Sequence, residues 1–122
     1  MLFFRALLVL FFYDALSSVC SFEIVYSKVK RWKAVPRTVH SDTIDRVCSA
    51  VNYACICYPK QVLCLQRSFV STYLLRRNGV PAQMVLGAQK IPFKAHAWVE
   101  VGGRAINERS NVQATYAVWD RC

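Results

Sequence analysis

The first stretch of the sequence is almost continuously apolar. Between residues 3 and 19 the charged residues are Arg5 and Asp14. A membrane-spanning helix needs about 20 apolar residues, and Asp14 interrupts this run early. We therefore expect a helix over 3–19 that packs in the core or docks on a partner or a membrane. The alternative is a secretory signal peptide with Arg5 as its charged end, but no small-x-small cleavage site follows cleanly.

Two further helices are predicted after a connector. Residues 21–37 combine basic and apolar side chains and close at Pro36. The run Ser41-Asp42-Thr43 offers an N-cap. Apolar residues then recur at helical spacing, at Ile44, Val47, Ala50, Val51 and Ala54. This helix should stop before Pro59, because the residue ahead of a proline avoids helical geometry.

The clearest helix signal runs from Cys64 to Arg77. Its apolar stripe consists of Leu65, Phe69, Val70, Tyr73 and Leu74. Arg76 and Arg77 fall in the last turn, where cations meet the negative end of the helix dipole. Asn78-Gly79 supplies the C-terminal stop.

After Gly79 the period becomes strand-like. Residues 82–88 are extended in pattern, and His96, Trp98 and Glu100 alternate with apolar residues up to Val101. Gly102-Gly103 makes a turn into a returning strand over 104–107, and 115–119 forms a last strand. Helices followed by an antiparallel sheet make an α+β domain.

The size and charge of the chain limit its organisation. At 122 residues we expect a single domain over 1–122, in which 1–40 is the N-terminal helix and basic connector and 41–122 is the core that carries the candidates for chemistry. The net charge of +9 favours anionic partners. Since no nucleic-acid motif frames the basic residues, we expect no nucleic acid but a solvated basic face or an acidic peptide partner.

Six cysteines allow a disulfide framework, a metal site or simple packing. Disulfides would require secretion, and removal of a signal segment would take Cys20 and leave an odd number. Cys48, Cys55, Cys57 and Cys64 lack the close ligand pairs of structural zinc sites, even with His40 nearby. We therefore expect core packing for Cys48 and Cys55, and neither a metal nor a cofactor.

Cys64 and His96 are the candidates for chemistry. A cysteine is usually a small buried hydrophobe, but Cys64 stands at the predicted start of a helix, where free amides and the dipole stabilise a thiolate. The same amides could hold an oxyanion. His96, on a strand beside Trp98, becomes a base if that strand packs against the helix.

The third residue of a triad depends on the hairpin register. A two-residue turn at Gly102-Gly103 places His96 across from Arg109 and turns Glu108 to the other face. A three-residue loop pairs Glu100 with Arg104, and then His96 lies across from Glu108. We predict the three-residue register, with Gly103 in the left-handed conformation, because it alone forms a Cys-His-Glu triad.

Three runs of residues, in order, carry a resemblance to a known family. They are Cys64-Leu-Gln-Arg-Ser-Phe, Leu74-Leu-Arg-Arg-Asn-Gly-Val-Pro-Ala82 and Pro92-Phe-Lys-Ala-His-Ala-Trp-Val-Glu-Val-Gly-Gly-Arg104. They resemble the peptidase (B) proteins of lasso peptide biosynthesis, which belong to the transglutaminase-like superfamily. The resemblance covers about residues 41–122. It implies a papain/transglutaminase-like fold with N-terminal helices packed on a small antiparallel sheet.

The resemblance also implies a function. Such proteins are cytoplasmic cysteine peptidases that cut the leader from a ribosomally made precursor, and an ATP-dependent cyclase then closes the ring. The chain resembles the split form, in which a separate protein recognises the leader. Cys64 falls on the family's nucleophile and His96 on its base. The family's Asn-Asp pair reads Asn107-Glu108 here, so Glu108 is the predicted acid and Asn107 the substitute.

Two other functions stay open on the sequence. An acyltransferase or amidase of the same fold would resolve a thioester at Cys64 with an amine. A non-catalytic module would use Cys64 as core and the basic surface to bind a partner.

Overall fold

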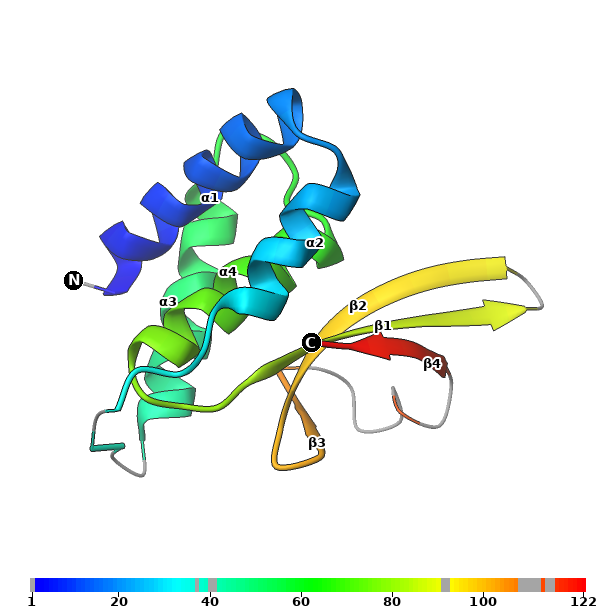
Figure 1. Cartoon of the computed structure of the whole chain (residues 1–122). Helices are drawn as coiled ribbons and strands as arrows, with labels where there is room; N and C mark the ends of the chain where they lie inside the picture. Colours follow the sequence, from blue (N-terminus) through cyan, green and yellow to red (C-terminus); the bar gives the residue numbers. More distant parts are fainter. Residues whose placement is uncertain (1, 37, 40–41, 91–92, 108–112, 114–115) are drawn as a thin grey trace.

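The computed structural model describes residues 2–36, 38–39, 42–90, 93–107, 113 and 116–122 (Figure 1). Four helices come first: α1 (Leu2–Val19), α2 (Phe22–Arg31), α3 (Thr43–Cys57) and α4 (Cys64–Arg77). The strands β1 (Gln83–Lys90), β2 (Phe93–Val101), β3 (Arg104–Ile106) and β4 (Ala117–Arg121) follow. The predicted α+β class, with helices preceding an antiparallel sheet, is confirmed.

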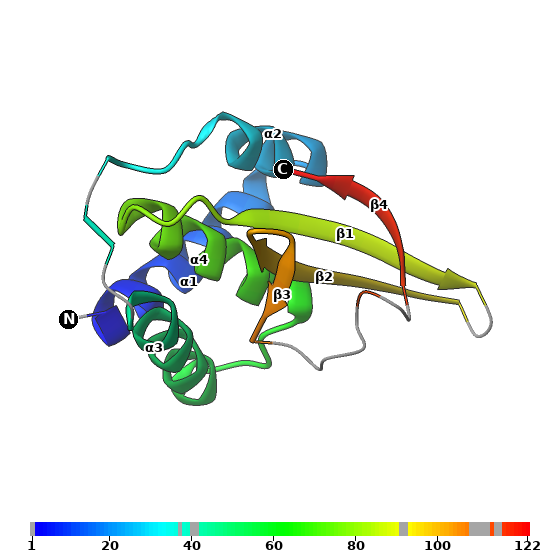
Figure 2. The same cartoon turned by 90° about the horizontal axis from the view of Figure 1, so that it is seen from below.

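Helix α4 lies at the centre of the molecule. It packs against α1, α2, α3 and the sheet (Figures 1 and 2). Nine of its fourteen residues are buried, including the polar residues Gln66, Ser68, Ser71 and Thr72. The apolar stripe predicted from the sequence is therefore too narrow, because neighbours cover α4 on nearly every side.

Arg76 joins the ends of several elements. Its guanidinium is buried and donates to the carbonyl of Ala82 at 2.9 Å and that of Trp32 at 2.7 Å. It also donates to the carbonyls of Val29 and Cys122. Arg76 stands in the last turn of α4 as predicted, but its main contacts lie outside that helix. It ties α4 to α2, to the start of β1 and to Cys122.

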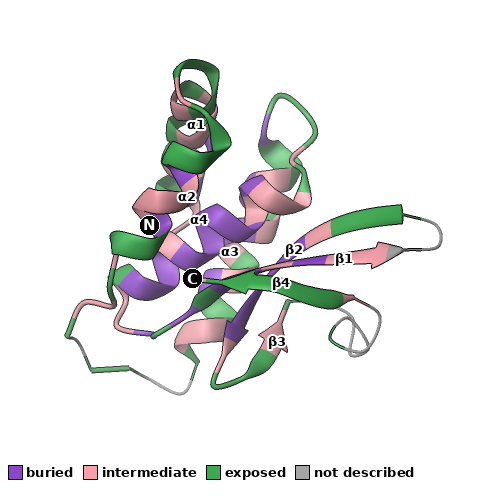
Figure 3. Cartoon of the chain, turned by 45° about the vertical axis from the view of Figure 1, so that its right-hand side comes forward, coloured by how far each residue is buried: buried purple, intermediate pink, exposed green. Residues whose placement is uncertain are grey.

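Helix α1 confirms the predicted N-terminal helix but buries little of its surface. Ala6 and Leu10 face the core, whereas Phe4, Leu8 and Phe11 are exposed (Figure 3). By length and composition α1 could cross a membrane, with 11% of its 18 residues buried. Buried core helices and signal sequences share those properties. The Tyr58 hydroxyl and the Lys60 ammonium, the latter at 3.0 Å, both contact the Asp14 carboxylate near its end.

Helix α2 lies in the stretch predicted as a connector. It begins after Ser21, has Glu23 in its first turn, and ends with three cations in its last turn. Val25 and Val29, four residues apart, are its buried positions. These local features are typical of a short amphipathic helix.

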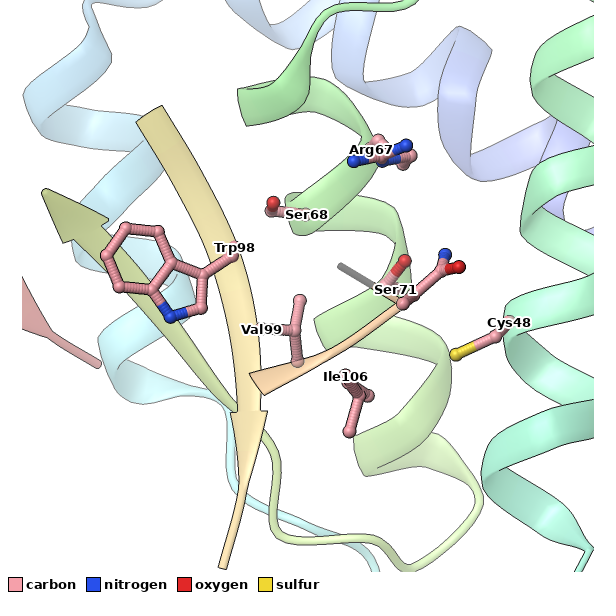
Figure 4. A pocket seen from close by; sticks show the side chains of 8 residues that line it. Cys48, Arg67, Ser68, Ser71, Trp98, Val99 and Ile106 are labelled. Carbon is pink, nitrogen blue, oxygen red and sulfur yellow. The ribbon is translucent and has the colours of Figure 1, made fainter. Parts of the chain in front are cut away.

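The four strands form an antiparallel sheet in the order β3-β2-β1-β4. Ala97 and Val99 of β2 face the helices, and His96, Trp98 and Glu100 alternate onto the other side, here called the distal face. Figure 4 shows the Trp98 indole on the side of β2 away from α4. The last strand lies slightly later than the predicted 115–119, at Ala117–Arg121.

The predicted three-residue register of the β2–β3 hairpin is wrong. Val101 pairs with Arg104, and Glu100 pairs with Ala105. Gly102 and Gly103 have φ angles of 60° and 79°, as in the two-residue turn that suits the twist of antiparallel strands. The requirement for a triad had favoured the other register, but the turn is set by the two glycines.

Candidate active site

Cys64 is the first residue of α4, as predicted. The preceding residue, Leu63, is extended and has no polar side chain with which to cap the helix. The first amides of α4 therefore point outward without partners inside the helix, and they favour negative charge nearby. Such amides are suited to hold an oxyanion that forms beside the sulfur.

His96 lies near the middle of β2, across from Gly87 of β1. Its ring stacks on Trp98 at a centroid distance of 5.9 Å and on Tyr116 at 5.2 Å. The predicted alternation is confirmed, since His96 and Trp98 share the distal face. Tyr116, which the sequence did not single out, restrains the imidazole from the segment before β4.

One cavity of about 190 Å³ joins the two candidates. Helices α2 and α4 contribute Phe22, Cys64 and Leu65, and the sheet contributes Leu86, Gly87, Ala95, His96, Ala97 and Trp119. The helix that carries the cysteine and the strand that carries the histidine thus border one space. Apart from Cys64 and His96, its walls are mostly apolar.

Among the described residues, no strand pairs with the outer edge of β2 beside His96. Strand β3 pairs with β2 opposite Val99, Glu100 and Val101, and it has no pairing opposite His96 within the described residues. His96 thus carries its imidazole on the distal face, whereas Cys64 stands in the helical layer, and the cavity that both residues line is bordered by α4 and by the sheet.

Tyr13 of α1 lies behind the start of α4. Burial, then the nearby charges of Asp14 and Cys64, raise the pKa of the Tyr13 hydroxyl. Its ring packs on Phe69 at 4.9 Å. Helix α1 therefore packs behind the start of α4, where Cys64 stands. The sequence pattern did not indicate this contact.

Glu100 forms a buried polar centre on the distal face. Its carboxylate accepts hydrogen bonds from Trp98 Nε1 at 3.0 Å, Gln113 Nε2 at 2.8 Å and Arg121 Nε at 3.0 Å. Burial acts to raise the pKa of Glu100, but these donors outweigh it, and the net pKa lies below the usual value. The network links the tryptophan beside His96 to β4.

The predicted acid cannot be placed, because Glu108 lies outside the described residues. Asn107, the substitute, exchanges two amide hydrogen bonds with Asn52 of α3, at 2.9 and 3.1 Å. Its φ of 56° ends the regular alternation of β3. The strand register therefore does not indicate a face of the sheet for Glu108. The side chain of Asn107 is already hydrogen-bonded to Asn52.

The remaining cysteines show no sign of a shared site. All six are free thiols, and burial, as the first cause, raises the pKa of Cys48 and Cys55. Cys48 borders a small pocket between α3, α4 and β2 (Figure 4). Across the described part of the chain, no three His, Cys, Asp or Glu residues gather as metal ligands would. His40 lies outside that part.

Two comparisons with known proteins agree with this arrangement. The chain is 36% identical over 55 residues to the microcin J25-processing protein McjB of Escherichia coli. That segment is 45% of this chain and about a quarter, 26%, of the relative. No solved structure matches. The model of the transglutaminase-like superfamily matches residues 9–120, and the chain belongs to that superfamily.

Proposed function

We propose that the protein is a cysteine peptidase that removes the leader from a ribosomally made lasso precursor peptide, with Cys64 as nucleophile and His96 as base. The observation that carries the proposal is the cavity lined by both residues, with Cys64 at the start of α4. The similarity to a microcin-processing protein supports the choice of substrate class.

The first half of the reaction forms an acyl-enzyme. His96 takes the proton of the Cys64 thiol, and the sulfur attacks the carbonyl carbon of the leader's last residue. The amides at the start of α4 stabilise the resulting oxyanion. The C–N bond then breaks as His96 protonates the departing amine, which is the new N-terminus of the core peptide.

The second half releases the leader. Water attacks the thioester while His96 accepts its proton, and the C–S bond breaks to return the Cys64 thiolate. The leader leaves as a carboxylate. Glu108 remains our proposal for the residue that orients His96, because Asn107 is occupied by Asn52.

The similarity to a microcin-processing protein suggests partners in the reaction. We propose that a separate leader-recognition protein delivers the precursor and that an ATP-dependent lasso cyclase consumes the product. A cytoplasmic location is proposed for the reaction, and the six free thiols support it, because disulfides are rare in reducing compartments.

The test is cleavage of a precursor peptide encoded beside the gene, followed by mass spectrometry, with the neighbouring recognition protein present and absent. Cleavage should disappear in Cys64→Ala and persist in Cys57→Ala, a matched change at an exposed cysteine. Cleavage by Cys64→Ala at the wild-type rate would refute the assignment of the nucleophile.

The same assay separates hydrolysis from acyl transfer. A labelled primary amine is added, and the leader product is weighed. A free carboxylate at its C-terminus supports the peptidase, whereas incorporation of the amine in preference to water would assign the chain to acyltransferases of the same superfamily.

A further inference from the structure

We infer that the cavity beside Cys64 is a subsite for one large apolar side chain of the substrate, and that Trp119 and Phe22 determine this specificity. The inference rests on the proposed function, because it takes the Cys64 sulfur as the attacking group. It adds a requirement on the sequence next to the scissile bond.

The walls favour hydrocarbon. Apart from the thiol and the imidazole, the side chains in the lining are those of Phe22, Leu65, Leu86, Ala95, Ala97 and Trp119. A charged side chain placed against these six residues would lose its hydration, because none of them offers an ionic partner. An apolar one would gain by leaving water. The volume of about 190 Å³ is sufficient, since a cavity of about 150 Å³ binds benzene.

A β-bulge directs Trp119 into the cavity. Leu86 pairs with Asp120 while the next residue, Gly87, pairs with Val118, so Trp119 is the extra residue of β4. Bulges of this kind redirect a side chain. Asp120 still faces the helices, where it pairs with Lys30 of α2 at 3.4 Å. Because of the bulge, β4 contacts α2 through Asp120 and lines the cavity through Trp119.

Phe22 stands opposite Trp119 on the first turn of α2. It stacks on Tyr26 with ring centroids 5.5 Å apart. Phe22 is 46% exposed and Trp119 is 71% exposed, although both line the cavity. Two large aromatic side chains from different layers thus border an apolar space, and each keeps exposed apolar surface that a bound side chain could bury.

The experiment compares two alkylating probes on the intact protein, iodoacetamide and N-benzyl-iodoacetamide. Digestion and mass spectrometry give the rate at each cysteine, and exposed Cys57 serves as the internal reference. We expect the benzyl-to-plain rate ratio to be about tenfold or more higher at Cys64 than at Cys57, the discrimination typical of apolar pockets. Equal ratios at the two cysteines would overturn the inference.

Three variants test whether the benzyl preference at Cys64 depends on this cavity. Ala95→Leu narrows the cavity from an exposed position, and Trp119→Ala removes a wall; both should lower the Cys64 ratio several-fold. Phe93→Ala removes an aromatic side chain that is also 71% exposed but outside the lining, and it should leave the ratio unchanged. A ratio unaffected by Ala95→Leu and Trp119→Ala would refute the role of this cavity.

The readout does not depend on peptidase activity. A benzyl preference at Cys64 without any precursor cleavage would support the apolar subsite and count against the proposed reaction. Cleavage without that preference would support the reaction and refute the subsite.

Discussion

Position 87 requires a glycine because the ring of Trp98, on which His96 stacks, occupies the space that a side chain would take. A Cβ added to Gly87 would lie 2.7 Å from Trp98 Cη2 and 2.8 Å from Cζ3, both parts of a ring that is 1% exposed. A glycine inside a strand often marks such a close approach. The sequence placed this residue in a strand but gave no sign of its partner, because the contact crosses from β1 to β2.

Gly87→Ala should therefore lower the free energy of unfolding by about 1–3 kcal/mol, the usual cost of overpacking. Urea unfolding followed by circular dichroism measures the change. The double variant Gly87→Ala/Trp98→Phe should recover part of the loss, because the smaller ring makes room. Strictly additive effects would show that the two residues do not compete for space.

Glu100 predicts a dependence of stability on pH. Its folded pKa is below the usual value of 4.5 because hydrogen bonds from Gln113, Trp98 and Arg121 outweigh burial. On acidification the unfolded chain binds the proton first, so this stabilisation is complete above about pH 5, declines below it, and is lost below the folded pKa.

Glu100→Gln should reduce stability at pH 7 by about 2 kcal/mol, since it weakens hydrogen bonds to a buried charge. The deficit relative to wild type should shrink as the pH falls from 5 to 3. Urea titrations of both proteins at several pH values test this. A deficit independent of pH would indicate that Glu100 contributes through shape alone.

At the scale of elements, local signals located helices well and the sheet less well. Helices α3 and α4 begin and end where the sequence predicted, because the signals for their ends are local. For α3 these signals are the turn before Thr43 and the proline at position 59, and for α4 the stop signal is Asn78-Gly79. Helix α2 was missed although Val25 and Val29 share a face. The hairpin register was wrong because it was chosen to place an acid across from His96, which lies beyond the residues that set the turn.

Arg76 holds elements together and supplies the next prediction. Arg76→Lys cannot reproduce donation to backbone carbonyls of α2, of the segment before β1 and of Cys122. Leaving buried carbonyls unsatisfied should cost at least about 2 kcal/mol of unfolding free energy.

The matched control is Arg77→Lys, at the exposed neighbouring position. It keeps a cation in the last turn of α4 and should change stability by less than about 0.5 kcal/mol. Thermal unfolding of the two variants gives the comparison. If Arg76→Lys lost no more stability than Arg77→Lys, any cation would suffice at position 76 and the guanidinium geometry would not matter.

At the scale of the whole molecule, the sequence singled out two residues that both line the cavity, but it did not indicate the rest of the cavity's surroundings. Cys64 and His96 came from helix polarity and motif order. Contacts between segments far apart in the sequence form the apolar walls, the bulge at Trp119 and the network at Glu100. The spacing of apolar residues along the chain does not reveal such contacts. Glu108 still rests on the resemblance, because the register argument for it failed.

The central claim is that the Cys64 sulfur attacks the peptide carbonyl with the help of His96. Acid quenching during precursor cleavage, followed by mass spectrometry of digested protein, measures the acyl-enzyme directly. The account predicts a leader thioester on the Cys64 peptide that hydroxylamine removes, and its loss in His96→Ala. A thioester on a different cysteine, or undiminished formation in His96→Ala, would contradict the account.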